Sequence, residues 1–145
     1  MDFQIRLAGK EDFDDVCRLM CQLFNPEYNA PVTLMEDIYL ANLSDDKKAY
    51  YLTESSGEVN GLCSITYDLR LSTLGKVMVI DEMVVDEKLR GMGIGAALVN
   101  GMMQVAKENG CAGIELSSSL QREGAHRFYE KHGFEKTGYR FNLDI

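Results

Sequence analysis

The sequence predicts one α/β domain over residues 1–145, with a mixed sheet and the element order β-α-α-β-β-β-α-β-α-β. Segments with strand-like alternation or continuous apolar runs are interleaved with segments whose apolar residues recur at helical spacing. The chain has 145 residues, of which 46% are hydrophobic, which suffices for one sizeable core but not for two ordinary domains. We find no internal repeat and no interdomain linker, so one domain is expected.

Periodicity and turn signals set the expected elements. Pro26 and Pro31 bracket a loop at 25–32, Ser56-Gly57 predicts a hairpin turn, and Asn109-Gly110 predicts a helix end. Acidic residues at 11–15 suit the positive N-terminal end of the first helix. In the second helix, Leu34, Ile38 and Leu43 are expected to face inward. The strands are expected at 3–7, 49–55, 58–69, 75–85, 112–117 and 134–142. The helices are expected at 11–24, 33–43 and 124–133, with one more within 90–110.

Charge and cysteine content narrow the possible functions. Fifteen Lys plus Arg against 23 Asp plus Glu give a net charge of −8, which disfavours nucleic-acid and anionic-membrane surfaces and favours a cationic small molecule. The N-terminus lacks a signal-peptide pattern and no apolar run is long enough to span a bilayer, so a cytoplasmic protein is expected. The four cysteines form no CxxC pair, and reduced, packed thiols are expected.

A glycine-rich segment, residues 90–95 (RGMGIG), lies between a buried strand and a helix. Its glycines let backbone N–H groups approach an anion at the positive helix end, and Arg90 adds a charge suited to phosphate, so a diphosphate fits. A nucleotide-dependent oxidoreductase is disfavoured, because the loop follows a late strand and only one further strand-helix pair remains. A Walker loop is excluded, because no Gly-Lys-Ser/Thr follows.

Two motifs carry a family resemblance. Arg90-x-x-Gly93-x-Gly95, preceded by MVVDEKL and followed by AHRFYEKHGF at 125–134, resembles the GNAT superfamily of acyl-CoA-dependent N-acetyltransferases. The resemblance implies acetyl-CoA as cosubstrate, splayed central strands that admit pantetheine, and Tyr129 as the general acid for the leaving thiolate. Where many members carry an asparagine that binds pantetheine, this chain has Arg122, which is either a phosphate contact or simply exposed. The CoA-binding residues implied are Met83, Val84, Val85, Arg90, Gly91, Met92, Gly93, Ile94, Gly95 and Ala96, with Arg122 and Phe128 as further candidates.

Asp81 and Glu82 are two acids inside an otherwise apolar strand, where an unpaired carboxylate is costly. Strict alternation places Asp81 with Val79 and Met83, and Glu82 on the opposite face with Ile80 and Val84, unless a bulge intervenes. In polyamine and amino-sugar-phosphate members of the superfamily a paired acid stands here, which makes both residues candidate bases. A structural ion pair is the alternative, and Glu115 is a weaker candidate base.

These features predict transfer of acetyl from acetyl-CoA to a primary amine by direct attack, since no cysteine has a basic neighbour to activate it as a nucleophile. The acceptor is expected to be small and cationic, of polyamine or amino-sugar type. Protein N-termini or lysines, and a non-catalytic acyl-CoA-binding module, are the alternatives. No metal site is expected, because the two histidines lack partners at ligand spacing. An edge strand at 139–141 could pair two subunits, so a homodimer is possible.

Overall fold

The computed structural model describes residues 2–24, 29 and 31–145, so most of the loop predicted at 25–32 lies outside the described residues. The chain divides into two compact units, Met1–Glu115 and Leu116–Ile145, which we describe separately.

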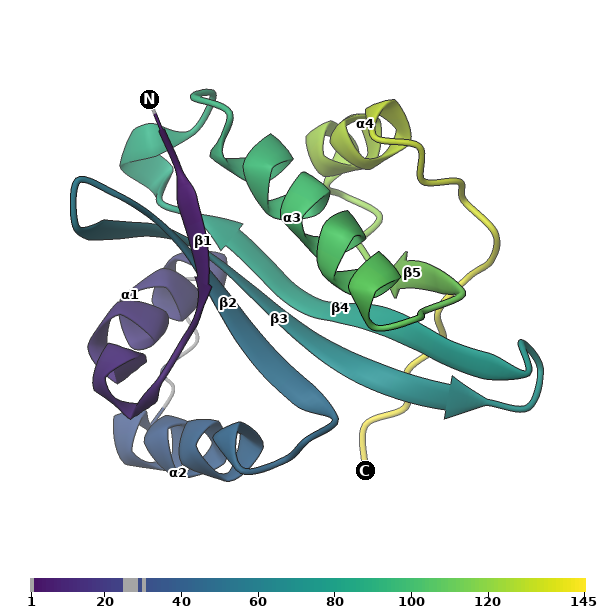
Figure 1. Cartoon of the computed structure of the whole chain (residues 1–145), viewed down its shortest axis with the longest axis horizontal. Coiled ribbons are helices and arrows are strands. Elements are labelled where there is room, and N and C mark those ends of the chain that lie inside the picture. Colours follow the sequence, from purple (N-terminus) through teal and green to yellow (C-terminus); the bar gives the residue numbers. More distant parts are fainter. Residues whose placement is uncertain (1, 25–28, 30) are drawn as a thin grey trace. The chain divides into compact units, whose positions relative to one another are not determined.

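A five-stranded sheet in the order β1-β2-β3-β4-β5 organises the larger unit. The strands are β1 (Gln4–Leu7), β2 (Lys48–Ser55), β3 (Glu58–Arg70), β4 (Gly75–Val85) and β5 (Gly113–Leu116). The first four pair antiparallel in sequence order. At the start of β5 the Ala112 N–H donates to the Lys76 carbonyl at 2.7 Å, so β5 begins beside β4. The β4 and β5 arrows point the same way in Figure 1, so the sheet is mixed, as predicted.

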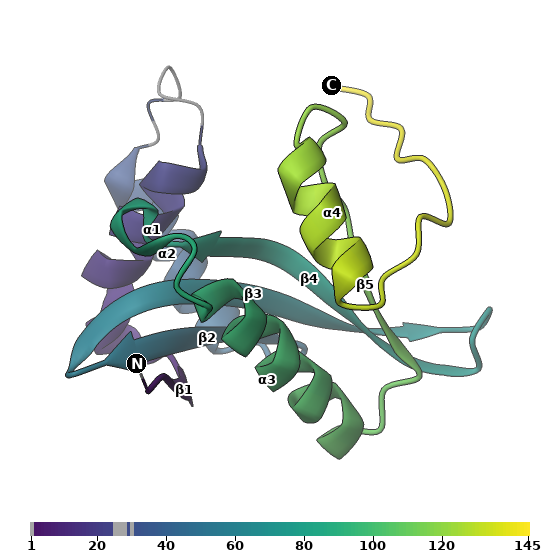
Figure 2. The same ribbon diagram turned by 90° about the horizontal axis from the view of Figure 1, so that it is seen from above.

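Helices cover both faces of this sheet (Figures 1 and 2). One face carries α1 (Phe13–Leu23) and α2 (Val32–Leu43), and the other carries α3 (Ile94–Glu108). Two short 3-10 turns, Lys10–Asp12 and Glu87–Leu89, precede α1 and the loop into α3. The bounds of these helices and strands agree with the sequence-based expectations to within a few residues, because hydrophobic patterning and turn residues delimit most of them.

The core under α1 and α2 is built from apolar side chains of both helices and of β2, β3 and β4: Phe13, Val16, Leu19, Tyr39, Leu52, Val59, Leu62 and Val84. The expected inward face of α2 is wrong in part. Leu34 and Ile38 are about half exposed, whereas Tyr39 is only 2% exposed. The Tyr39 hydroxyl donates to the Gly9 carbonyl at 2.7 Å, and its ring packs 5.7 Å from that of Phe13. Because α2 is apolar on both faces, its period alone did not select the buried one.

The acidic start of α1 does more than complement the helix end. Asp12 is 6% exposed, and its two carboxylate oxygens each accept a hydrogen bond from the Arg6 guanidinium at 2.9 Å. The Gly9 N–H donates to the same carboxylate at 2.8 Å, and Arg6 also pairs with Glu54 at 3.1 Å. This cluster ties β1 to the start of α1 and to β2.

The smaller unit contains one helix, α4 (Glu123–Lys131). The strand predicted at 134–142 is wrong, because residues 134–145 form no ladder with another strand. Tyr139, Phe141 and Leu143 alternate as in a strand but are at least 85% exposed. Alternation favours an extended chain, but a strand forms only where a neighbour satisfies its backbone groups.

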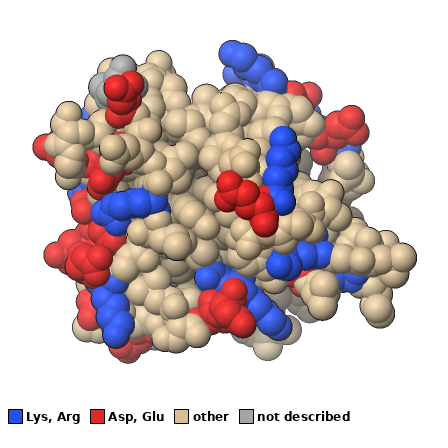
Figure 3. Space-filling view, viewed as in Figure 1, with Lys and Arg blue, Asp and Glu red and all other residues tan. Residues whose placement is uncertain are grey.

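The surface over α1 and α2 mixes both signs of charge. On the face seen in Figure 3, acidic side chains gather over these helices with basic ones between them.

All four cysteines are free thiols. Cys63 is buried, whereas Cys21 is exposed, so the expectation of packed thiols holds for only some of the four. Among the described residues no helix is long and apolar enough to cross a membrane.

Candidate functional site

A β-bulge places both strand acids at one site. Across the β3–β4 ladder, Ser64 lies opposite Glu82, while the next residue of β3, Ile65, lies opposite Ile80. Asp81 is therefore the extra residue of the bulge. Successive residues of β3 point to opposite faces, so Glu82 shares a face with Ser64 and not with Ile80. The strict alternation considered from the sequence does not hold at Asp81.

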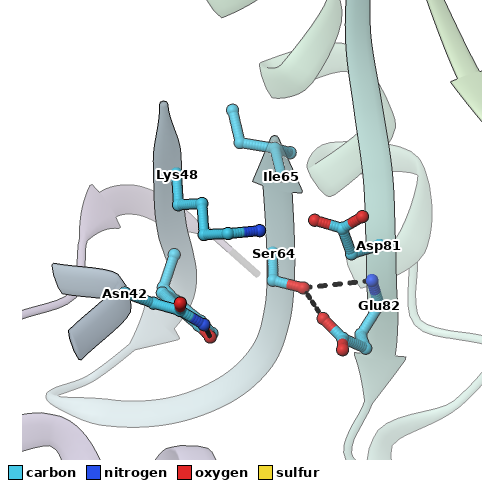
Figure 4. Close-up of a pocket in the computed structure, with 7 residues that line it drawn as sticks. Asn42, Lys48, Ser64, Ile65, Asp81 and Glu82 are labelled. Atoms are coloured by element: carbon cyan, nitrogen blue, oxygen red, sulfur yellow. Dashed lines mark hydrogen bonds between the residues drawn. The ribbon is translucent and has the colours of Figure 1, made fainter. Parts of the chain in front are cut away.

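The two acids line a polar cavity of about 270 Å³ on the side of the sheet covered by α1 and α2 (Figure 4). Its lining residues come from α2 and three strands: Asn42, Lys48, Tyr50, Ser64, Ile65, Asp81 and Glu82. A more apolar cavity of about 240 Å³ adjoins it and shares Asn42, Tyr50 and Glu82. A small acceptor with an amine can be accommodated here.

Each carboxylate is held by a hydroxyl of β3. Thr66 Oγ1 donates to Asp81 Oδ2 at 2.5 Å, and Ser64 Oγ donates to Glu82 Oε2. Lys48 Nζ donates to Thr66 Oγ1 at 3.0 Å, so the cavity also holds a cation. Neither acid forms an ion pair within 4.0 Å among the described residues. The structural ion-pair explanation for these acids therefore has no support in the described part of the chain.

Burial and charge tune the cavity. Burial, followed by the negative charge of Asp81, raises the pKa of the Glu82 carboxyl above its ordinary value, and the positive charge of Lys48 partly offsets the rise. Burial also raises the pKa of the Tyr50 hydroxyl, which accepts a hydrogen bond from Asn42 Nδ2 at 2.8 Å. Glu82 is thus protonated more readily than an ordinary glutamate, which suits a group that accepts a proton from a bound amine.

The glycine-rich segment leads into α3 as expected. Gly91 and Gly93 have φ values of +82° and +90°, a conformation that other residues adopt only with strain. A Cβ at either glycine would meet nothing within 4 Å, so space above the loop is open. No side chain caps the first turn of α3, and Arg90 and Met92 are exposed beside it. The first helical residue, Ile94, is 1% exposed, anchors the helix, and is followed by half-buried Gly95 and Ala96.

The C-terminal end of β4 has one paired edge. Met83, Val84 and Val85 pair with Cys63, Leu62 and Gly61 of β3. On the other side β5 begins beside Lys76 and is four residues long, so it ends before reaching Met83. An extended ligand can therefore add to β4 here as a further strand.

Tyr129, Phe128 and Arg122 belong to the smaller unit. The Tyr129 ring is half-buried, with centroids 5.4 Å from Phe128 and 5.8 Å from Phe134. Arg122 is exposed at the start of α4. These residues thus lie together on and beside one helix, within a unit described by itself.

Glu115 is engaged elsewhere. Its carboxylate forms an ion pair with Arg70 Nη1, and Arg70 Nε donates to Asp68 at 2.8 Å. The Glu115 carboxylate is therefore engaged by Arg70, whereas Glu82 forms no ion pair among the described residues. In the described part of the chain, no group of three acidic, histidine or cysteine residues could hold a metal ion.

Five polar residues of the site were not predicted from the sequence: Asn42, Lys48, Tyr50, Ser64 and Thr66. Ser64 and Thr66 alternate with the buried Cys63 and Ile65, so a polar stripe on one face of the 58–69 strand was readable. That stripe meets Asp81 and Glu82 only in the register observed, which the sequence did not specify.

Comparison with known proteins identifies the family to which the chain belongs. Residues 14–134 match the acetyltransferase (GNAT) family. Aminoalkylphosphonate N-acetyltransferase of Salmonella typhimurium is 33% identical over 138 residues, which cover 95% of this chain and 88% of that protein. Glucosamine 6-phosphate N-acetyltransferase of Trypanosoma brucei brucei is 26% identical, and the alignment covers 100% of this chain and 97% of that protein. N-acetyltransferase 8 of Rattus norvegicus is 32% identical over 78% of this chain, which spans 50% of that longer protein.

Solved structures show the same fold. A transcriptional regulator from Bacillus halodurans superposes with a TM-score of 0.87 at 24% identity, over 99% of this chain and 100% of that one. An aminoglycoside N-acetyltransferase in complex with CoA gives 0.85 at 17% identity, over 99% and 95%. With the family match over residues 14–134, the chain belongs to the GNAT family and is an acetyl-CoA-dependent N-acetyltransferase.

Proposed function

We propose that this enzyme acetylates the primary amine of a small cationic acceptor, of polyamine or amino-sugar type, by direct attack of the amine on acetyl-CoA. The observation that carries the proposal is the bulge at Asp81, which brings two carboxylates into one small polar cavity. A cavity of this size and charge favours a small ammonium over a folded protein surface.

The acceptor needs a base. An alkyl ammonium with a pKa near 10.4 is neutral in only about one part in 10³ at pH 7, a deficit of roughly 4.6 kcal/mol for a nucleophile. In the proposal, Asp81 holds the ammonium and Glu82 removes its proton. Both carboxylates also raise the pKa of the bound ammonium, so proton transfer requires a partner whose own pKa is raised, as that of Glu82 is.

Acetyl-CoA supplies the activated thioester. The first-turn amides of α3 and Arg90 are proposed to hold its diphosphate, and the open edge of Met83–Val85 its pantetheine. Open space at Gly91 and Gly93 and the uncapped helix end support this assignment. Arg122 and Phe128 are proposed as further contacts.

Tyr129 is proposed to protonate the leaving thiolate. A thiol pKa near 8.5 against tyrosine near 10 makes full transfer uphill by about 2 kcal/mol, so a strong hydrogen bond suffices. We also propose that residues 1–145 form a single domain.

Two relatives support a small acceptor. Both align along most of their length, and their names specify aminoalkylphosphonates and glucosamine 6-phosphate. Acetylation of protein N-termini or lysines is the alternative acceptor class, and a non-catalytic acyl-CoA-binding module is the alternative function.

An amine panel tests the proposal by thiol release from acetyl-CoA. It contains spermidine, glucosamine 6-phosphate, 2-aminoethylphosphonate, an aminoglycoside, and peptides with a free N-terminus or a lysine. We expect saturable release with at least one small amine and a loss of about 10² or more in kcat/KM for Glu82→Gln. Glu58→Gln, an exposed glutamate at the start of β3, is the matched control. Release with peptides alone would favour the protein-acceptor alternative. Stabilisation by acetyl-CoA without release to any amine would favour the non-catalytic module.

A further inference from the structure

Three polar side chains form a chain across β2, β3 and β4. Lys48 Nζ lies 3.0 Å from Thr66 Oγ1, which lies 2.5 Å from Asp81 Oδ2. Figure 4 shows the Lys48 ammonium pointing toward the cavity that Asp81 lines. Neither Lys48 nor Thr66 has a role in the function proposed above.

Local pairing builds this chain. Lys48 and Thr66 are directly opposite each other across the β2–β3 ladder, so their side chains share a face. Thr66 is opposite Val79 in the next ladder, two residues before Asp81. The bulge turns Asp81 toward the same cavity, within reach of the threonine hydroxyl.

The direction of both hydrogen bonds is fixed by chemistry. An ammonium group can only donate, so Thr66 Oγ1 accepts from Lys48. The single proton of the threonine hydroxyl is then left for Asp81, whose ionised carboxylate can only accept. A positive charge at one end and a carboxylate at the other strengthen both hydrogen bonds, which orients the Asp81 side chain.

Glu82 is held differently. Ser64 Oγ accepts the Glu82 N–H at 3.0 Å and donates to the Glu82 carboxylate. Among the described residues no cation is hydrogen-bonded to this pair, and the Lys48 charge acts on Glu82 only through space. Titratable or charged neighbours reach Glu82 from three strands, and α2 contributes only a neutral amide. These groups are Lys48 and Tyr50 of β2, Cys63 of β3, Asp81 of β4, and Asn42 of α2.

We propose that Lys48 and Thr66 are positioning residues that divide the work of the two carboxylates: they hold the Asp81 carboxylate in the orientation that binds the ammonium, and leave Glu82 to accept its proton. The inference rests on the proposed function. The first proton passes from R–NH₃⁺ to the Glu82 carboxylate, and the free amine forms the new C–N bond as the C–S bond breaks. The nitrogen then loses its second proton to become the neutral amide, and this loss balances the proton that the leaving thiolate takes up. Glu82 then returns its proton to solvent, which regenerates the enzyme.

The pH profile of kcat/KM tests the role of Lys48. On the acidic side of this profile kcat/KM falls as Glu82 becomes protonated. Lys48→Met should move this acidic limb to higher pH by about half a pH unit or more, because Glu82 loses its only nearby cation among the described residues. Lys48→Arg should keep the limb near its wild-type position. Lys47→Met is the matched control, since Lys47 is exposed and its observed hydrogen bonds are made by its backbone. An unmoved limb in Lys48→Met, or an equal shift in Lys47→Met, would overturn the inference.

Thr66 is tested by a double-mutant cycle. Thr66→Val removes the link but leaves the Lys48 charge, so kcat/KM should fall about tenfold with little movement of the limb, and Thr66→Ser should restore most of the activity. Losses from Thr66→Val and Lys48→Met measured at high pH should be strongly non-additive, because both break one chain. Fully additive losses would show that Lys48 and Thr66 act independently and would contradict the proposed chain.

A titration without turnover separates this inference from the proposed function. Carbon-13 NMR of labelled glutamate carboxyls, with Glu82 assigned from Glu82→Gln, reports its protonation directly. The Glu82 midpoint should rise in Lys48→Met and not in Lys47→Met, whether or not an amine is acetylated. If Lys48→Met fails to fold, Lys48→Gln replaces it, and an unchanged midpoint in the folded variant overturns the inference.

Discussion

Ser64 forms two hydrogen bonds with Glu82 across the β3–β4 ladder. Its hydroxyl oxygen accepts from the Glu82 backbone N–H at 3.0 Å, and its hydroxyl group donates to the Glu82 carboxylate. Backbone and side chain of the glutamate are thereby fixed by one small residue. The carboxylate remains at the cavity without an ion pair among the described residues, so its ionisation depends on burial and on nearby charges.

Glu82 should lower stability at neutral pH. Its folded-state pKa is raised above the unfolded value, so the stability linked to this group is fully present below the unfolded pKa and is lost as pH rises through the folded pKa. Glu82→Gln should therefore be more stable than wild type at pH 7, by on the order of 1 kcal/mol. Urea unfolding at pH 7 and at pH 4 should show this advantage shrinking as pH falls. A constant advantage at both values would contradict the raised pKa.

Asp12 should act in the opposite sense. Arg6 holds the pKa of the Asp12 carboxyl below its ordinary value, so its stabilisation is present above the unfolded pKa and is lost as pH falls through the folded pKa. Asp12→Asn should destabilise the protein by about 2 kcal/mol at pH 7, a buried-pair effect reduced by the partial exposure of Arg6. Denaturant unfolding measures the difference, which should narrow below about pH 4. Asp14→Asn, at an exposed position of α1, is the control and should change stability little.

Arg90→Ala should weaken CoA binding by roughly tenfold, which is the contribution of one charge-assisted phosphate contact. Acetyl-pantetheine lacks the diphosphate, so its kcat/KM should change little. Binding of CoA by calorimetry and turnover of acetyl-pantetheine separate the two effects. Lys88→Ala, an exposed cation two residues away, is the comparison. Equal losses for both ligands would reject a diphosphate contact.

Tyr129→Phe should lower turnover by about tenfold to a hundredfold while acetyl-CoA affinity stays within a few-fold. The ring and its packing against Phe128 and Phe134 are retained, so only the hydroxyl is lost. Steady-state kinetics and direct binding should be measured on the same preparation. Tyr139→Phe, at an 85% exposed position, serves as the control. Unchanged turnover would remove Tyr129 as the general acid.

Local sequence signals predicted most of the larger unit. Strands and helices between residues 3 and 117 have clear periods, and Gly91 and Gly93 take the left-handed conformation that a glycine-rich turn allows. The two acids stood out because carboxylates are costly in an apolar strand. These predictions needed only information within about fifteen residues.

Features that depend on pairing were not predicted. Nothing local in GKVMVIDEMVV marks Asp81 as the bulged residue, because the bulge exists only relative to β3. Lys48 and Thr66 contact each other only because of the register between β2 and β3. The buried side of α2 depends on which of its two apolar faces packs against the sheet. The alternation after Phe134 was readable, yet no partner strand pairs with it.

Because Asp81 is the extra residue of the bulge, it can be removed without disturbing the pairing of the rest of β4. With Ser64 opposite Glu82 and Ile65 opposite Ile80, removing Asp81 alone would leave an unbroken ladder with every neighbouring pair in place. A single-codon deletion could thus take away one of the two carboxylates without shifting the apolar positions on either side. Conversely, inserting one acidic residue at this point of a strand without a bulge would add a second carboxylate to the cavity. The number of carboxylates can therefore change here while the apolar core stays the same.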